Sequence, residues 1–276
     1  MERRSLLQAL SILGVAIGGP VRLTHAVGPA DPPPSIRLHK QGRLKCFADK
    51  GACEFLDFGH RVHLISSTGM RTAVQAPETS STERYQTRYV DAEQTPDGDV
   101  LLLDHGNRRL RRFSALGQHL EDLDLSDSVL SPQGLVLHET GLGISDSQAH
   151  RLLFLNRLGE ITHSVGQGLE LHGAAAMARG NKGDIHLLCP DQGQILIFDH
   201  QGRFQTSYGQ SVVGPGVQSI ALRDSNEVFL LDHWRNTVLS GGPDIPWRTR
   251  LALGEQHPVR FRSLSFTNRD ELVLSV

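Results

Sequence analysis

The sequence predicts an all-β protein folded as a six-bladed β-propeller. Three observations predict it: a repeated strand layout, a repeat period in the low forties, and partial copies of the repeat at both ends. Five segments share an apolar strand ending in aspartate, a polar loop, an alternating strand, a glycine turn and a further strand. Their aspartates are Asp57, Asp104, Asp146, Asp191 and Asp232, at steps of 47, 42, 45 and 41 residues. This period suits four short strands with tight loops, which is one propeller blade.

A sixth copy of the repeat begins near the C-terminus and covers only the first half of a blade. It runs from Phe261 to Val276, and Ser275 stands 43 residues after Asp232, where the next aspartate would be expected. A half-blade would leave an unpaired apolar edge, which promotes aggregation. Another part of the chain is therefore expected to complete this sheet.

The N-terminal residues 35–47 resemble the second half of a repeat, because Gln41-Gly-Arg matches Gln201-Gly-Arg. We predict that strands within 35–47 pair with the C-terminal half-blade and close the propeller, which then spans residues 35–276. Gly42 and Asp57 are only 15 residues apart, so 43–47 cannot easily serve both the last blade and the first. One of these two blades should have three strands, and the sequence leaves open which one.

The repeated aspartates are expected to accept backbone N–H groups in the loops that follow them, a structural role. The glycines between the third and fourth strands should provide turn dihedrals that other residues avoid. These glycines are Gly69, Gly117, Gly159 and Gly202.

One copy of the repeat resembles a known family. The segment Asp104-His-Gly-Asn-Arg-Arg-Leu-Arg-Arg-Phe-Ser-Ala-Leu-Gly117 is similar to the NHL repeat, in which an aspartate, a glycine and an asparagine precede an alternating strand. The resemblance covers residues 43–254 best. It implies six blades around a central channel and no single activity, since members include binding modules as well as a few lyases and hydrolases.

The N-terminus has the features of an export signal over residues 1–26, followed by a proline-rich linker over 27–34. Arg3-Arg4 precede a short apolar run, and the small residue Ala26 stands where cleavage is expected. The segment resembles a twin-arginine signal. The alternative is an amphipathic helix of the mature domain, which Gly18-Gly-Pro would break. We expect a periplasmic or secreted protein without a stable membrane span, because the apolar run is too short.

Composition limits the partners. With 28 basic and 30 acidic residues, the formal net charge is -2, which argues against nucleic acid as the main partner. The basic cluster from Arg108 to Arg112 is expected to be partly neutralised by Glu121, Asp122 and Asp124 on the next strand. Of three cysteines, Cys46 and Cys53 could face each other across a hairpin, so the sequence leaves open whether they form a disulfide or remain thiols.

In a propeller, loops after second strands surround one mouth of the channel, and ligands usually bind there. The side chains expected at this mouth are His60, Arg61, His105, Arg108, His150, His172, Gln194, His233 and Trp234. Segments between blades add Tyr85, Arg88, Tyr89, Gln133 and Gln218. We predict a non-catalytic binding module without a cofactor, whose loops hold a protein, peptide or saccharide.

The alternative is a metal-dependent lyase or hydrolase, and the sequence leaves open whether the protein is an enzyme. His105, His172 and His233 could then bind a divalent ion, since imidazole and carboxylate suit zinc and similar metals. No nucleophile elbow or phosphate-binding glycine loop accompanies them. No catalytic residue is therefore assigned.

Overall fold

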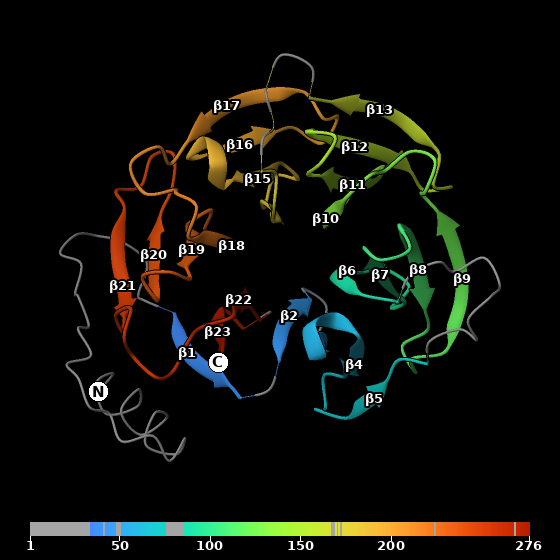
Figure 1. The fold of residues 1–276 in the computed structure, drawn as a ribbon, viewed down its shortest axis with the longest axis horizontal. Coiled ribbons are helices and arrows are strands. Elements are labelled where there is room, and N and C mark those ends of the chain that lie inside the picture. The colour runs from blue at the N-terminus through green and yellow to red at the C-terminus, as the bar shows by residue number, and fades with distance from the viewer. Residues whose placement is uncertain are drawn as a thin grey trace.

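The computed structural model describes residues 34–40, 42–47, 51–75, 86–166, 169, 171, 173–223, 225–267 and 269–276. Six sheets stand around a central axis like the blades of a propeller, as Figure 1 shows. The fold prediction is confirmed. The expected export signal and nearly all of the linker lie outside the described residues. Within the described part of the chain, no helix is both long and apolar enough to cross a bilayer.

Five blades have four strands each, given from the innermost strand outward. Blade one contains β2 (Arg43–Phe47), β3 (Gly51–Leu56), β4 (Arg61–Ile65) and β5 (Arg71–Ala73), and blade two contains β6 (Tyr89–Gln94), β7 (Val100–Asp104), β8 (Arg109–Phe113) and β9 (His119–Asp124). Blade three contains β10 (Pro132–His138), β11 (Gly141–Asp146), β12 (Arg151–Asn156) and β13 (Ile161–Val165). Blade four contains β14 (Met177–Arg179), β15 (Ile185–Cys189), β16 (Gln194–Phe198) and β17 (Phe204–Tyr208), and blade five contains β18 (Val217–Leu222), β19 (Val228–Asp232), β20 (Thr237–Gly241) and β21 (Arg248–Ala252).

Blade six has three strands and joins the two ends of the described chain. Its innermost strand β22 (Ser263–Phe266) pairs antiparallel with β23 (Glu271–Ser275), and β23 pairs in parallel with β1 (Ser35–His39). The parallel register runs from Ser35 opposite Glu271 to His39 opposite Ser275. Ring closure by an N-terminal strand is confirmed, and blade six is the blade that lacks a strand.

The expectation that all of 35–47 completes blade six is wrong in its second half. Residues 43–47 form β2, the innermost strand of blade one, and only β1 belongs to blade six. The reason is chain direction. In the other blades, the fourth strand leads into the innermost strand of the next blade and runs parallel to the second strand of its own blade. β1 leads into β2 in the same way, so it has the direction of a fourth strand. Since blade six has no antiparallel third strand, β1 lies directly against β23 and the pairing is parallel.

Serine hydroxyls attach blade six to blade one at the innermost strands. Leu44 N donates to Ser263 Oγ at 3.2 Å and to Ser275 Oγ at 3.0 Å, and Cys46 N donates to Ser265 Oγ at 2.8 Å. The position that holds aspartate in the other repeats therefore holds a serine that contacts the neighbouring blade.

The second strands form the interior of the ring. β7, β15 and β19 are buried along their whole length because neighbouring blades cover both faces of each sheet. One shared cluster packs Phe55 of blade one against Leu102 and Phe113 of blade two. The four predicted turn glycines all have positive φ, between 74° and 85°.

The two cysteines of the first hairpin do not face each other. Cys46 lies opposite Ala52 and Cys53 lies opposite Lys45, so the two thiols project from opposite faces of the sheet. All three cysteines are free. Burial raises the pKa of the Cys53 thiol far above its usual value and that of Cys189 to about 12. Neither is a reactive thiolate at neutral pH.

Candidate functional site

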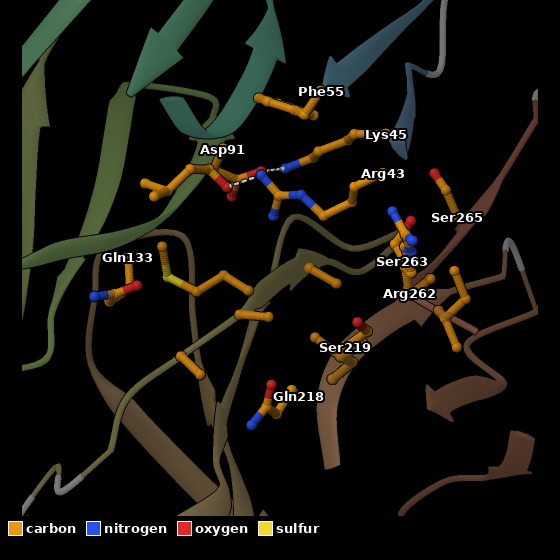
Figure 2. Close-up of a pocket in the computed structure, with 18 of the residues that line it drawn as sticks. Arg43, Lys45, Phe55, Asp91, Gln133, Gln218, Ser219, Arg262, Ser263 and Ser265 are labelled. Carbon is orange, nitrogen blue, oxygen red and sulfur yellow. Dashed lines mark hydrogen bonds and ion pairs between the residues drawn. The ribbon is translucent and has the colours of Figure 1, made fainter. Parts of the chain in front are cut away.

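A channel with a volume of about 1510 Å³ runs along the axis of the ring. Its wall is made by the innermost strand of each blade and by the loops at their starts. Figure 2 shows Arg43 and Lys45 extending from one strand toward Asp91, with Gln133, Gln218 and Arg262 at other sides of the same space.

The middle of the channel wall holds a compensated charge cluster. Lys45 Nζ of blade one lies 2.8 Å from Asp91 Oδ1 and 3.0 Å from Glu93 Oε1 of blade two. Asp91 Oδ2 also accepts the Leu135 N–H of blade three at 2.8 Å. Burial alone would lower the pKa of Lys45, but the two carboxylates reverse this effect and raise it. The lysine is therefore charged at every physiological pH, and the cluster connects three blades.

Arg43 lies nearer the mouth, and its environment is different. Its Cζ lies 4.3 Å from the centroid of the Phe55 ring, and its Nη2 donates to the Val90 carbonyl. Burial lowers the pKa of Arg43, with attraction to Asp91 opposing the shift and the nearby charge of Arg88 adding to it. Within the described residues, no carboxylate lies within ion-pair distance of this guanidinium.

Two more arginines line the same end of the channel. Arg88 precedes β6, and its Nε is buried without a hydrogen-bond partner in the described part of the chain. Arg262 precedes β22 and is exposed. Gln218 is also exposed there, and Gln133 Nε2 donates to Ser131 Oγ at 3.3 Å. This mouth therefore has guanidinium and amide groups with unused hydrogen-bonding capacity.

The predicted loop residues only partly reach the channel. Of the nine mouth candidates, His233 lines it, and its Nε2 lies 3.3 Å from Ser219 Oγ. His60 Nδ1 donates to the Thr87 carbonyl at 2.7 Å, and His105 Nδ1 donates to the Pro132 carbonyl at 2.8 Å. Both carbonyls lie beside or in the next blade, so these two histidines attach loops to neighbouring blades.

The other candidates lie around the ring. Arg61 is exposed and pairs with Asp57 at 2.5 Å, and Arg108 Nη1 donates to the Val129 carbonyl at 3.4 Å. His150 lines a smaller pocket of about 540 Å³, Gln194 contacts Gln192, and Trp234 is 62% exposed. His172 and Tyr85 lie outside the described residues. Four predicted interblade residues do line the channel: Arg88, Tyr89, Gln133 and Gln218.

The five repeated aspartates fall into two groups. Asp104, Asp146 and Asp232 are buried and accept backbone N–H groups of the following loop, from Asn107 at 3.2 Å, Ala149 at 3.3 Å and Arg235 at 2.9 Å. Asp57 and Asp191 are exposed in short 3-10 turns, η1 (Asp57–Gly59) and η2 (Pro190–Gln192). These two carboxylates line the channel mouth instead.

The structure separates two of the three histidines of the metal hypothesis. His105 belongs to blade two and His233 to blade five, on opposite sides of the ring. Among the described residues, no group of three or more His, Cys, Asp or Glu side chains could hold a metal ion.

Three of the four arginines in the basic cluster at 108–112 pair with carboxylates of their own blade. Arg109 lies 3.4 Å from Asp122, Arg111 lies 3.2 Å from Asp104, and Arg112 lies 2.7 Å from Asp99 and 3.0 Å from Glu121. The neutralisation expected from the next strand is confirmed. The cluster is not an open basic surface.

Sequence reasoning missed the inner-strand charges, although a signal existed. Arg43 and Lys45 alternate on one strand, and Asp91 and Glu93 alternate on another. A spacing of two places each pair on one face of its own strand, and opposite charges on neighbouring innermost strands indicate that these faces could pair.

The fold and the site define a six-bladed β-propeller with a polar central channel. No family model matches the sequence, and no curated protein matches it. Among solved structures, the chain is similar to a streptogramin B lyase, with a TM-score of 0.62 and 12% identity over 86% of this chain and 75% of that chain. The chain is also similar to virginiamycin B lyase from Staphylococcus aureus, with a TM-score of 0.62 and 11% identity over 89% of this chain and 79% of that chain.

A third similar structure is a catalytically inactive virginiamycin B lyase from Staphylococcus aureus with quinupristin, with a TM-score of 0.60 and 10% identity over 90% and 78% of the two chains. At such identities the likeness shows a shared fold and no shared activity. The resemblance to the NHL repeat stays a prediction.

Proposed function

We propose that the protein is an exported, non-catalytic binding module that holds its ligand at the arginine-lined mouth of the channel. The observation that carries this proposal is a pair of large aromatic side chains exposed on that face. Phe58 is 95% exposed and lines the channel mouth, and Trp234 is 62% exposed in the equivalent loop of blade five.

The backbone around Phe58 supports this function. Asp57, Phe58 and Gly59 have φ values of 48°, 58° and 94°, so three consecutive residues lie in the left-handed region. A bulky residue pays a conformational cost there, and such strain clusters at ligand-binding sites. Exposed aromatic residues are also enriched in binding surfaces. The loop at residues 57–59 therefore exposes the Phe58 ring to water and adopts a strained backbone to do so. A role of Phe58 in ligand binding would explain this conformational cost.

Capture from the exported fraction tests the proposal. The mature protein serves as bait beside the variants Phe58→Ala and Trp234→Ala, and each captured partner is identified and its affinity measured. We expect both variants to lose at least about tenfold in affinity, as binding hot spots do. Their thermal stability should stay near that of the wild type, because both side chains are exposed.

Leu158→Ala is the matched control, since Leu158 is 81% exposed on the β12–β13 turn, at the opposite face. A partner that binds all four proteins equally well would contradict a site at this mouth.

A metal-dependent lyase or hydrolase is the alternative, and export from the cytoplasm is common to both proposals. The alternative depends on His172 and on groups that would have to meet His105 or His233. Elemental analysis of protein purified from the exported fraction without chelator tests it. A stoichiometric divalent metal, lost in His172→Ala, would favour the enzyme over the binding module.

A further inference from the structure

Three arginines lie at or directly before the start of the innermost strand on three neighbouring blades. Arg262 lies immediately before β22 of blade six, Arg43 is the first residue of β2 of blade one, and Arg88 lies immediately before β6 of blade two. Blades six, one and two are adjacent in the ring (Figure 1), and all three residues line the channel. The guanidinium groups therefore form an arc around one side of the channel mouth, which we call the arginine arc.

The innermost strands of the other three blades are not preceded by arginine. The residues directly before β10, β14 and β18 are Ser131, Ala176 and Gly216. Small residues in blade four, Ala174 to Ala176, leave space opposite the arc. The arginine arc therefore lies on one side of the mouth, and an entering ligand would have room on the far side.

Among the described residues, Asp91 attracts Arg43 electrostatically but forms its ion pair with Lys45 instead. No carboxylate within the described ranges forms an ion pair with any of its three arginines. Asp91 is already engaged by Lys45 and by the Leu135 N–H, and Asp57 by Arg61. Asp191 lines the mouth from blade four, across the ring from Arg43.

The arc also has unused and preorganised donors. The buried Nε of Arg88 has no partner in the described part of the chain, and the Arg43 guanidinium is held in place by Phe55 and the Val90 carbonyl. Leaving a buried donor unpaired costs free energy, which a bound acceptor would recover. Placing two guanidinium groups close together is also unfavourable unless an anion lies between them.

We propose that the arginine arc binds an oxyanion, a carboxylate or phosphate group of the ligand that enters the channel. The planar fork of a guanidinium matches the oxygens of such groups, and several forks on one side fix the orientation of the group. Gln133 and Gln218 extend the donor set to blades three and five. The inference rests on the proposed binding function and names the chemistry that the channel recognises. The anion comes either from a free small acid or from an acidic segment of a polypeptide.

Calorimetric titration at low ionic strength tests the inference with three anionic probes: a triglutamate peptide, tricarballylate and inorganic phosphate. A triglutamine peptide is the neutral reference. We expect at least one anionic probe to bind the wild type, to bind about tenfold more weakly to Arg88→Gln and to Arg262→Gln, and to lose affinity as salt is added. Arg88→Lys should recover only part of the loss, because lysine keeps the charge without the fork.

Arg269→Gln is the matched control. Arg269 is exposed in the turn between β22 and β23, at the opposite end of the same blade as Arg262, and its loss changes the net charge equally. Binding of the triglutamate peptide alone would identify a polypeptide source, and binding of the small acids alone would identify a free acid. The inference is overturned if no anionic probe binds the wild type, or if binding is the same in Arg88→Gln, Arg262→Gln and Arg269→Gln.

The two proposals can fail separately. A captured partner that depends on Phe58 and Trp234 but binds Arg88→Gln and Arg262→Gln normally would leave the binding function standing and remove the oxyanion site. The anionic probes could instead bind in a way that depends on the arginine arc, while partner capture is unchanged in Phe58→Ala and Trp234→Ala. That result would support the oxyanion site and contradict the proposed binding function.

Discussion

At the scale of single residues, the repeated aspartate has different energetic roles in different blades. Asp104 and Arg111 have no exposed side-chain surface and lie 3.2 Å apart, and Asp104 Oδ1 also accepts the backbone N–H groups of Arg88 and Asn107. Asp57 occupies the same place in its repeat, yet its carboxylate is 57% exposed. The same sequence position is therefore a buried structural anchor in blade two and a surface group in blade one.

This difference gives a paired prediction. Asp104→Asn should lower the free energy of unfolding by about 3 kcal/mol, because it removes a fully buried carboxylate that pairs with the buried Arg111 charge. Asp57→Asn should leave the free energy of unfolding nearly unchanged, because water replaces the lost interaction. Urea denaturation of both variants measures the effect. Equal destabilisation would show that burial does not determine what this carboxylate contributes.

At the scale of elements, the sequence predicted the second strands well because their apolar pattern repeats once in every blade. Val100 to Leu103 are all apolar before Asp104, a run that favours a strand covered on both faces, and it recurs at the blade period. Residues 35–47 were harder, since 35–39 and 43–47 both have the composition of strands and only residues 40–42 separate them, with Gly42 at a φ of 56°. Chain direction decided their assignment, and direction within a sheet depends on contacts far apart in the sequence.

The candidate site was predicted in the loops, but the structure adds the innermost strands. Charged residues that alternate with apolar ones, as in Arg43–Phe47, also describe a strand with one face in water. Only the closed ring turns that face into the wall of a channel. The interblade residues Arg88, Gln133 and Gln218 were identifiable because the repeat places every interblade segment at the same mouth.

The closing strand β1 is also attached by a buried carboxylate, which gives a prediction at the same scale. Glu54 of β3 is fully buried and lies 2.8 Å from His39 of β1, 3.2 Å from His63 and 3.2 Å from Arg71. Glu54→Gln should increase hydrogen exchange across 35–39 and 271–275 and lower the free energy of unfolding by about 3 kcal/mol, because a buried ionic partner is lost.

Glu271→Gln is the control within the same pair of strands, because the Arg37–Glu271 pair is partly exposed and 4.0 Å apart. It should change exchange little, since such surface pairs contribute less than about 1 kcal/mol. Equal exchange in the two variants would mean that the β1–β23 hydrogen bonds alone hold the closure.

At the scale of the whole molecule, stability depends on the ring being closed. Blade one is attached to blade six by the Leu44 and Cys46 hydrogen bonds, and blade six is completed only by β1. Each blade contacts its two neighbours, so opening one junction removes a packing surface from both sides. Without β1, the apolar second strand β23 would become a sheet edge in water.

Truncation tests this dependence. A chain that starts at Lys40 lacks β1 and should unfold at lower temperature, less cooperatively, and should form dimers or aggregates through β23. A chain that starts at Pro34 retains β1 and serves as the control. Because a missing strand can be replaced by a peptide that adds to the free edge, a synthetic peptide of residues 34–40 should restore part of the thermal stability of the shorter chain. Size-exclusion chromatography and calorimetry report both effects. A monomeric, equally stable chain from Lys40 would mean that five blades and a two-stranded sheet suffice to close the ring.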